Sequence, residues 1–129
     1  MAHRYLIVGA GAAGIAAAET IREQDPGGDV LLVGEESHGY YSRPGLAYYL
    51  TGELPERQLF PFTERDFDRL RLRRLYARVA ALQPQTHEVT LDGGRRLPYD
   101  RLLLATGSLA ARPPLPGVDL DGMVKLDDM

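Results

Sequence analysis

The chain has 129 residues, enough for one domain with its own hydrophobic core. Hydrophobic residues make up 44% of the chain and charged residues 26%, as in ordinary globular proteins. The net charge of −3 argues against nucleic acid or an anionic membrane as a partner. The absence of cysteine excludes disulfides, thiolate metal sites and a CxxC redox pair from this chain. No apolar run is long enough to span a bilayer and no signal-peptide pattern precedes Arg4, so we predict a cytoplasmic protein.

The first part of the chain predicts a β-α-β unit. Arg4–Val8 is apolar and ends at a glycine, as expected for a buried strand. Ala12–Gln24 is rich in alanine with apolar residues at helical spacing, and the turn residues of Asp25–Asp29 end this helix. Val30–Val33 reads as a second buried strand. This order implies two parallel strands joined by a right-handed crossover, the start of a Rossmann-like α/β fold.

Two short helices are expected next. Pro44 can open a helix that runs to about Leu50, because proline suits the first helical turn. Thr63 and Asp66 have the spacing of a capping box, with aspartate in place of glutamate, and predict a helix that runs to about Leu70.

The remaining chain has the two-residue period of strands. We expect three short strands at Leu75–Leu82, Glu88–Leu91 and Arg95–Leu97, with Asp92–Gly94 as the hairpin turn between the last two. These strands predict a small antiparallel β-meander. Arg101–Ala105 then reads as one more buried strand.

A glycine-rich turn joins the first predicted strand to the first predicted helix. Gly9, Gly11 and Gly14 fit the pattern G-x-G-x-x-G, in which the glycines make a tight turn, admit a pyrophosphate and allow close helix–strand packing. The start of the helix offers unpaired N–H groups and a partial positive charge to phosphates. By itself, the pattern is equally typical of a bare strand-to-helix turn.

An acidic pair supplies the context that the glycines need. Glu35 lies 21 residues after Gly14, at the end of the second predicted strand, where a carboxylate can accept both ribose hydroxyls and repel a 2′-phosphate. Glu36 can share this role. Two adjacent glutamates alone would indicate a solvated loop, but strand, glycines, helix, strand and acid in this order predict dinucleotide binding.

Two further motifs follow the glycine turn with Ala18 and the acidic pair, namely Tyr41-Ser-Arg-Pro-x-Leu46 and Tyr99-Asp-Arg-Leu-Leu-Leu-Ala-Thr-Gly-Ser108. These four motifs, in this order, resemble the FAD-binding part of the pyridine nucleotide-disulfide oxidoreductases. The likeness is greatest to ferredoxin and rubredoxin reductases, nitrite-reductase-type flavoproteins and apoptosis-inducing-factor-like proteins. The resemblance implies FAD as the cofactor and NAD(P)H as the co-substrate of the intact protein, with an α/β fold that is part of a larger flavoprotein with two dinucleotide domains.

The resemblance also implies roles by position. The pyrophosphate would contact the glycine turn, the adenosine ribose the acidic pair, and the diphosphate the Arg-Pro dipeptide. The adenine would meet the backbone of the strand before the hairpin, and small residues after the last strand would pass close to the cofactor. The cofactor-binding residues so implied are Gly9, Gly11, Ala12, Ala13, Gly14, Glu35, Glu36, Arg43, Pro44, Val79, Ala105, Thr106 and Gly107.

The chain departs from these families in three ways. Some members carry a reactive cysteine near Pro44, which is absent here, so a thiol mechanism is excluded for this part of the protein. Many ferredoxin-reductase-like members have Ser-Lys where Ala47-Tyr48 stands. Members are also several hundred residues long. We therefore expect residues 1–116 to be the first segment of the FAD-binding domain and residues 117–129 a crossover toward an NAD(P)H-binding domain.

Three functions stay open at this point. The chain is the FAD-binding portion of a reductase that passes hydride from NAD(P)H to flavin and electrons to a ferredoxin- or rubredoxin-type protein or a small acceptor. Alternatively, it is a non-catalytic nucleotide-binding module, or a subunit that a partner chain completes. No catalytic side chain is predicted within the chain. His3, His38 and His87 share no ligand-like spacing, so no metal site is predicted.

Overall fold

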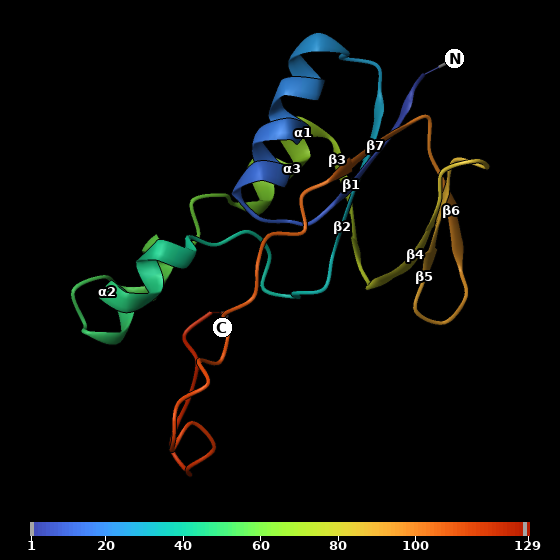
Figure 1. Cartoon of the computed structure of the whole chain (residues 1–129). Helices are drawn as coiled ribbons and strands as arrows, with labels where there is room; N and C mark the ends of the chain where they lie inside the picture. The colour runs from blue at the N-terminus through green and yellow to red at the C-terminus, as the bar shows by residue number, and fades with distance from the viewer. Residues whose placement is uncertain (1, 128) are drawn as a thin grey trace.

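The computed structural model describes residues 2–127 and 129, and it contains two β-sheets and three α-helices (Figure 1). A parallel sheet has the strand order β3-β2-β1-β7, and an antiparallel sheet has the order β4-β5-β6. The elements are β1 (Arg4–Val8), α1 (Ala12–Gln24), β2 (Asp29–Gly34), the 3₁₀ helix η1 (Arg43–Gly45), α2 (Leu46–Leu50), the 3₁₀ helix η2 (Glu56–Gln58), α3 (Glu64–Leu70), β3 (Leu72–Tyr76), β4 (Val79–Gln83), β5 (Glu88–Leu91), β6 (Arg96–Pro98) and β7 (Arg101–Leu104).

The parallel sheet is the middle layer, with α1 and α3 on one face and the antiparallel sheet on the other (Figure 1). Successive side chains of β1 point to opposite faces, as the strand geometry requires. Leu6 and Val8 pack with Val89 of β5, whereas Ile7 packs with Ile15 of α1. Because both faces of β1 are covered, every residue from Leu6 to Val8 is buried. This arrangement confirms the predicted Rossmann-like fold with a β-meander.

The helix starts that the sequence predicts are also present. A 3₁₀ turn with Pro44 in its first positions leads directly into α2. The N-terminus of α3 is capped by Asp66, whose Oδ2 accepts hydrogen bonds from the Thr63 N–H at 2.8 Å and the Thr63 hydroxyl at 2.7 Å. These contacts lower the pKa of Asp66, the hydrogen bond from the Thr63 N–H being the largest cause.

The predicted single strand Leu75–Leu82 is wrong. The segment belongs to two strands in different sheets, because β3 pairs in parallel with β2 and β4 pairs antiparallel with β5. The chain passes from one sheet to the other at Ala77 and Arg78, where the Ala77 N–H donates to the Gly34 carbonyl at 2.9 Å. Alternating apolar residues continue through this corner, so the local pattern does not mark it.

The prediction that Arg101–Ala105 is buried is also wrong, although the strand itself forms as β7. Leu103 is 38% exposed and Leu104 is 56% exposed. The reason is position: β7 lies at the end of the parallel sheet and pairs only with β1 among the residues that the structure describes. Burial of these leucines therefore requires a layer that this part of the chain does not provide.

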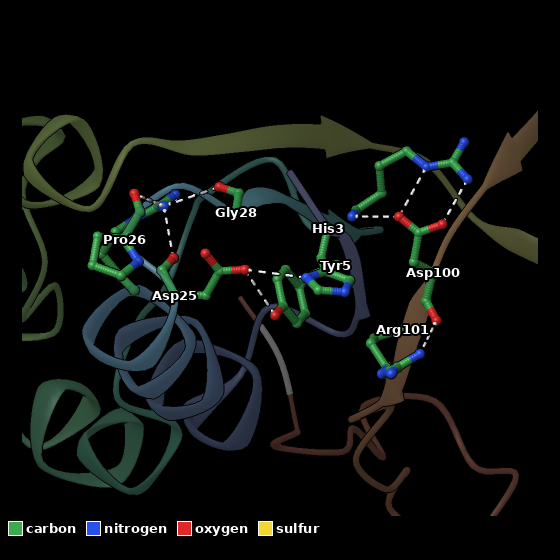
Figure 2. Close-up of polar contacts among 9 residues, drawn as sticks. His3, Tyr5, Asp25, Pro26, Gly28, Asp100 and Arg101 are labelled. Carbon is green, nitrogen blue, oxygen red and sulfur yellow. Dashed lines mark hydrogen bonds and ion pairs between the residues drawn. The ribbon is translucent and has the colours of Figure 1, made fainter. Parts of the chain in front are cut away.

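An ion pair fixes the start of β7 against the start of β1, away from the carboxyl ends of these strands (Figure 2). Asp100 accepts hydrogen bonds from Arg4 Nε at 3.2 Å, from Arg4 Nη2 at 2.8 Å and from the Arg4 backbone N–H at 2.8 Å. Hydrogen bonds from the Arg4 side chain, the largest cause, and from its backbone hold the pKa of Asp100 well below its usual range. These contacts align the two strands in register.

We expect this ion pair to make stability depend on acid pH. Because the pKa of Asp100 is lower in the folded chain than in the unfolded chain, its contribution is full above about pH 4 and is lost as the pH falls further. In thermal unfolding of the native chain and Asp100→Asn, the difference in midpoint should therefore shrink as the pH drops from 7 toward 2.5. The matched control is Asp119→Asn, which removes an exposed pair with Arg112. An unchanged difference for Asp100→Asn across this range would contradict the assignment.

Arg22 of α1 donates hydrogen bonds to backbone carbonyls at the end of α3 and in the turn before β2. Its Nε donates to the Leu70 carbonyl at 2.7 Å, and Nη1 donates to the carbonyls of Pro26 and Gly28, each at 2.9 Å. A lysine ammonium cannot reach these diverging acceptors at once. We expect Arg22→Lys to lower the free energy of unfolding by roughly 1–2 kcal/mol in urea titration. The control is Arg57→Lys on the exposed surface of η2, which should change stability little.

Candidate functional site

Three loops meet at the carboxyl ends of neighbouring parallel strands. They begin at Gly9 after β1, at Glu35 after β2 and at Ala105 after β7. The Gly9 N–H donates to the Val33 carbonyl at 2.8 Å, and the Ala105 N–H donates to the Val8 carbonyl at 2.7 Å. The neighbours β2 and β7 lie on opposite sides of β1, so this is the point where the strand order reverses. Open α/β sheets bind ligands at such a switch point.

The three glycines of the turn have different surroundings. Gly9 has φ = +114°, and a Cβ there would lie 2.0 Å from the Ala105 carbonyl oxygen. A Cβ at Gly14 would lie 2.0 Å from the Gly9 carbonyl oxygen. A Cβ at Gly11 would meet nothing within 4 Å. Two glycines are thus required by the packing of the chain itself, whereas the third faces open space.

The N-terminus of α1 is open beside Gly11. Gly11 is the N-cap residue, its carbonyl accepts the Ile15 N–H at 3.0 Å, and no side chain caps the helix. Gly11, Ala12 and Ala13 are all exposed, and the first turn contains no acidic residue. A helix start with uncapped N–H groups and a partial positive charge favours an anion.

The two predicted acids turn to different neighbours. Glu35 is exposed and its carboxylate lies 3.8 Å from Nε of Arg78, which is next to Val79 at the start of β4. Glu36 is half-buried and forms a hydrogen-bonded ion pair with Arg43. Glu35 accepts no hydrogen bond from a side chain within residues 2–127, so its carboxylate oxygens are available to a ligand hydroxyl.

Arg43 lies in a cluster with Tyr41 and Glu36. Its guanidinium is 5.3 Å from the centre of the Tyr41 ring, and the adjacent Pro44 is exposed. Tyr41 is buried, and its hydroxyl oxygen has no hydrogen-bond partner in the part of the chain that the structure describes. Burial is the main cause of the raised pKa of Tyr41, with Glu36 adding to it. Tyr41, Glu36 and Arg43 therefore form one cluster beside the loop after β2.

A hollow lies beside the acidic pair, on the side of α3. Its smaller part is lined by residues that include Ala10, Gly34, Glu36 and Tyr76. An adjoining cavity of about 210 Å³ has a lining that includes His38, Tyr40, Phe62, Phe67 and Arg74. Aromatic side chains and Arg74 thus line a hollow beside Glu36.

The structure brings most of the predicted residues to one edge of the sheet. Ala105 contacts Gly9, and Thr106 and Gly107 follow it as exposed residues. Val79 is half-buried and pairs with Leu91 of β5, and its neighbour Arg78 contacts Glu35. No strand pairing or backbone hydrogen bond joins Val79 to the glycine turn within the residues described.

Sequence reasoning missed three residues at this edge, namely Tyr41, Arg78 and Asp127. Tyr41 belongs to the Tyr-Ser-Arg-Pro motif, but the burial of its hydroxyl depends on packing against Leu46 and Leu59. Arg78 and Asp127 reach the site through contacts with Glu35 and Arg43 that are distant in the sequence. No local pattern signals such contacts.

None of the helices formed by the described residues is long and apolar enough to cross a membrane. The model of the pyridine nucleotide-disulphide oxidoreductase family matches residues 3–129. The chain is 41% identical over 116 residues to the ferredoxin–NAD(+) reductase component of 3-phenylpropionate/cinnamic acid dioxygenase from Photorhabdus laumondii, an alignment that covers 86% of this chain and 28% of that protein. It is 38% identical over 128 residues to the corresponding component of the biphenyl dioxygenase system from Paraburkholderia xenovorans, covering 95% of this chain and 30% of that protein.

Solved structures show the same likeness. The ferredoxin reductase for the CYP199A2 system from Rhodopseudomonas palustris superposes with a TM-score of 0.83 and 28% identity, covering 97% of this chain and 32% of that chain. The reductase of the covalent putidaredoxin reductase–putidaredoxin complex superposes with a TM-score of 0.80 and 32% identity, covering 91% of this chain and 28% of that chain. The chain thus spans 28–30% of the length of the two curated relatives. Together, the family model, these relatives and the fold establish that the chain belongs to the pyridine nucleotide-disulphide oxidoreductase family.

Proposed function

We propose that this chain is the FAD-binding portion of an NAD(P)H-dependent flavoprotein reductase that delivers electrons to a ferredoxin-type protein. The observation that carries the proposal is the open position at Gly11. At Gly9 and Gly14, backbone atoms of the chain occupy the space where a Cβ would lie. At Gly11 that space is open, beside the uncapped start of α1. A dinucleotide diphosphate is the kind of group that such a position admits.

The residues of the site fit an adenine dinucleotide in three parts. The diphosphate would lie against the N–H groups at Gly11–Ala13, with Arg43 supplying fixed donors and positive charge. The adenosine ribose would hydrogen-bond to Glu35. The adenine would lie toward Val79, and the contact between Glu35 and Arg78, the residue before Val79, supports this placement. Ala105–Gly107 would pass beside the cofactor without bulky side chains in its way.

When bound, FAD supplies the ability to accept a hydride from NAD(P)H and to pass the two electrons on to an acceptor. The chain's own contribution is to bind and orient. The helix N-terminus and Arg43 neutralise the phosphates, and the parallel strands hold the loops rigidly in register.

We further propose that residues 1–116 form the first segment of the FAD-binding domain and that residues 117–129 lead toward the NAD(P)H-binding domain. The exposed leucines of β7 support this division, because they need a covering layer.

Direct tests are the absorbance spectrum of the purified chain and release of flavin after denaturation. FAD in the released material supports the cofactor assignment, and FMN in its place would contradict it. The longer protein that contains this segment should be bleached by NADH under anaerobic conditions. The 129-residue chain alone should show no steady NADH oxidation. Sustained turnover by the isolated chain would contradict the division of labour proposed here.

We expect Glu35→Ala to weaken FAD binding more than Glu36→Ala. Glu35 has free acceptor oxygens, whereas the carboxylate of Glu36 is committed to Arg43. Loss of a charge-assisted hydrogen bond to the ribose should cost roughly 1.5–3 kcal/mol. Titration with FAD and with NADP⁺ measures both variants, and the 2′-phosphate of NADP⁺ should bind better to Glu35→Ala than to the native chain. Equal losses in the two variants would show that the ribose assignment is wrong.

A further inference from the structure

The C-terminal segment (residues 108–127) leaves the site and returns to it. Figure 1 shows this segment running from the end of β7 away from the sheets, turning, and coming back toward its own starting point. Apolar packing does not hold it in place, because Leu109 is 86% exposed and Val124 is 88% exposed. The contacts that close the segment are polar.

Asp127 makes the contacts that join the two ends of this segment. Its Oδ2 accepts a hydrogen bond from the Ala110 N–H at 3.1 Å and lies 3.3 Å from Nζ of Lys125. Lys125 in turn donates to the Ala110 carbonyl at 3.2 Å. The Asp127 side chain is only 19% exposed, in contrast to Asp119 at 87% in the same segment. The hydrogen bond from the Ala110 N–H, the largest cause, and the nearby ammonium of Lys125 lower the pKa of Asp127.

The same residue reaches the candidate diphosphate site through its backbone. Nη1 of Arg43 donates to the Asp127 carbonyl, while Nη2 of Arg43 donates to Glu36. The guanidinium is thereby held from two sides, by the loop after β2 and by the end of the C-terminal segment. A guanidinium fixed in this way loses less conformational freedom when it binds a phosphate.

We propose that Asp127 is a positioning residue, which closes the C-terminal segment and presents its carbonyl to Arg43 so that the guanidinium is oriented for a diphosphate. The last clause rests on the proposed function. The closure of the segment on Arg43 does not, because it follows from contacts within the chain. The proposal therefore makes two separable claims, a conformational one and a binding one.

Trypsin tests the conformational claim without any ligand. Lys125 is the cleavable basic residue of the segment, because Arg112 is followed by a proline. Lys125 and Leu126 are exposed, but cleavage requires the backbone around them to leave its closed conformation, so opening of the segment should speed cleavage of the Lys125–Leu126 bond. Each rate is divided by that of a peptide of residues 119–129, which carries the substitution where it falls within those residues and is native for Arg43→Ala. On this scale, Asp127→Ala and Arg43→Ala should each raise the rate of cleavage roughly 3- to 10-fold. Asp127→Asn keeps an acceptor for the Ala110 N–H, so its rate should stay closer to that of the native chain. The control Asp119→Ala should be cleaved at the native rate. If Arg43→Ala left the rate unchanged, the proposal would be overturned, since Asp127 would then close the segment without Arg43.

FAD titration of a double-mutant cycle tests the binding claim. If Asp127 acts through Arg43, Asp127→Ala should weaken FAD binding roughly 3- to 10-fold in the native background and have no further effect in the Arg43→Ala background. Additive losses would overturn the positioning role. If Arg43→Ala bound FAD as tightly as the native protein, the proposed role of Arg43 in FAD binding would be refuted, and with it the binding claim. The trypsin rates would still decide whether the segment closes on Arg43.

Discussion

Gly9→Ala is expected to lower the free energy of unfolding by roughly 3–5 kcal/mol, the largest loss from any single methyl group added to this chain. Two effects combine at this position. The backbone has φ = +114°, which an alanine adopts only with strain, and the new Cβ would lie 2.0 Å from the Ala105 carbonyl oxygen. The structure can relieve the overlap only by separating the glycine turn from the end of β7. Urea titration followed by far-UV circular dichroism measures the loss.

The other two glycines of the turn make this test specific. Gly14→Ala should also be strongly destabilising, because its Cβ would meet the Gly9 carbonyl oxygen at 2.0 Å. Gly11→Ala should leave stability within about 0.5 kcal/mol of the native value, because its backbone is extended and its Cβ meets nothing within 4 Å. Similar unfolding midpoints for all three variants would mean that the turn is not packed as described.

Gly11→Ala should instead weaken FAD binding, by roughly 10- to 100-fold. A methyl group at this position occupies the space through which a diphosphate would approach the N–H groups of Ala12 and Ala13. The folded chain itself gains no clash, so affinity falls without loss of structure. Isothermal titration with FAD, alongside circular dichroism of the same preparation, separates the two effects.

Ala16→Gly is the matched control for this variant. It changes a single methyl group on the exposed face of the same helix, away from the N-terminus, and should leave FAD affinity unchanged. Native affinity in Gly11→Ala would contradict the placement of the diphosphate at the start of α1.

The first half of the fold could be predicted from the sequence because its signals are local. The glycine turn, the alanine-rich helix and the turn residues at Asp25–Asp29 each constrain the backbone over a few residues. The bounds of β1 and α1 in the structure match the expected ones. The hairpin at Asp92–Gly94 is local in the same sense and joins β5 to β6.

The errors arise where a long-range contact decides the structure. No glycine or proline marks the corner at Ala77 and Arg78, which exists because β3 pairs with β2 and β4 does not. The apolar run of β7 predicts burial, but burial depends on what lies against the strand and not on the strand itself. The site residues also divide into those with a local signal and those brought together by long-range contacts. The glycine turn was recognisable from local spacing, whereas Arg78 and Asp127 reach Glu35 and Arg43 only in the folded chain.

We propose that this chain holds the adenosine and diphosphate half of an FAD site. Titration of the purified chain with FAD, ADP and FMN, followed by isothermal calorimetry, tests it most directly. We predict that ADP and FAD bind with similar affinity and compete with one another, and that FMN, which lacks the adenosine, binds far more weakly. Binding of FMN as tight as that of FAD, or the absence of binding by ADP, would contradict the account.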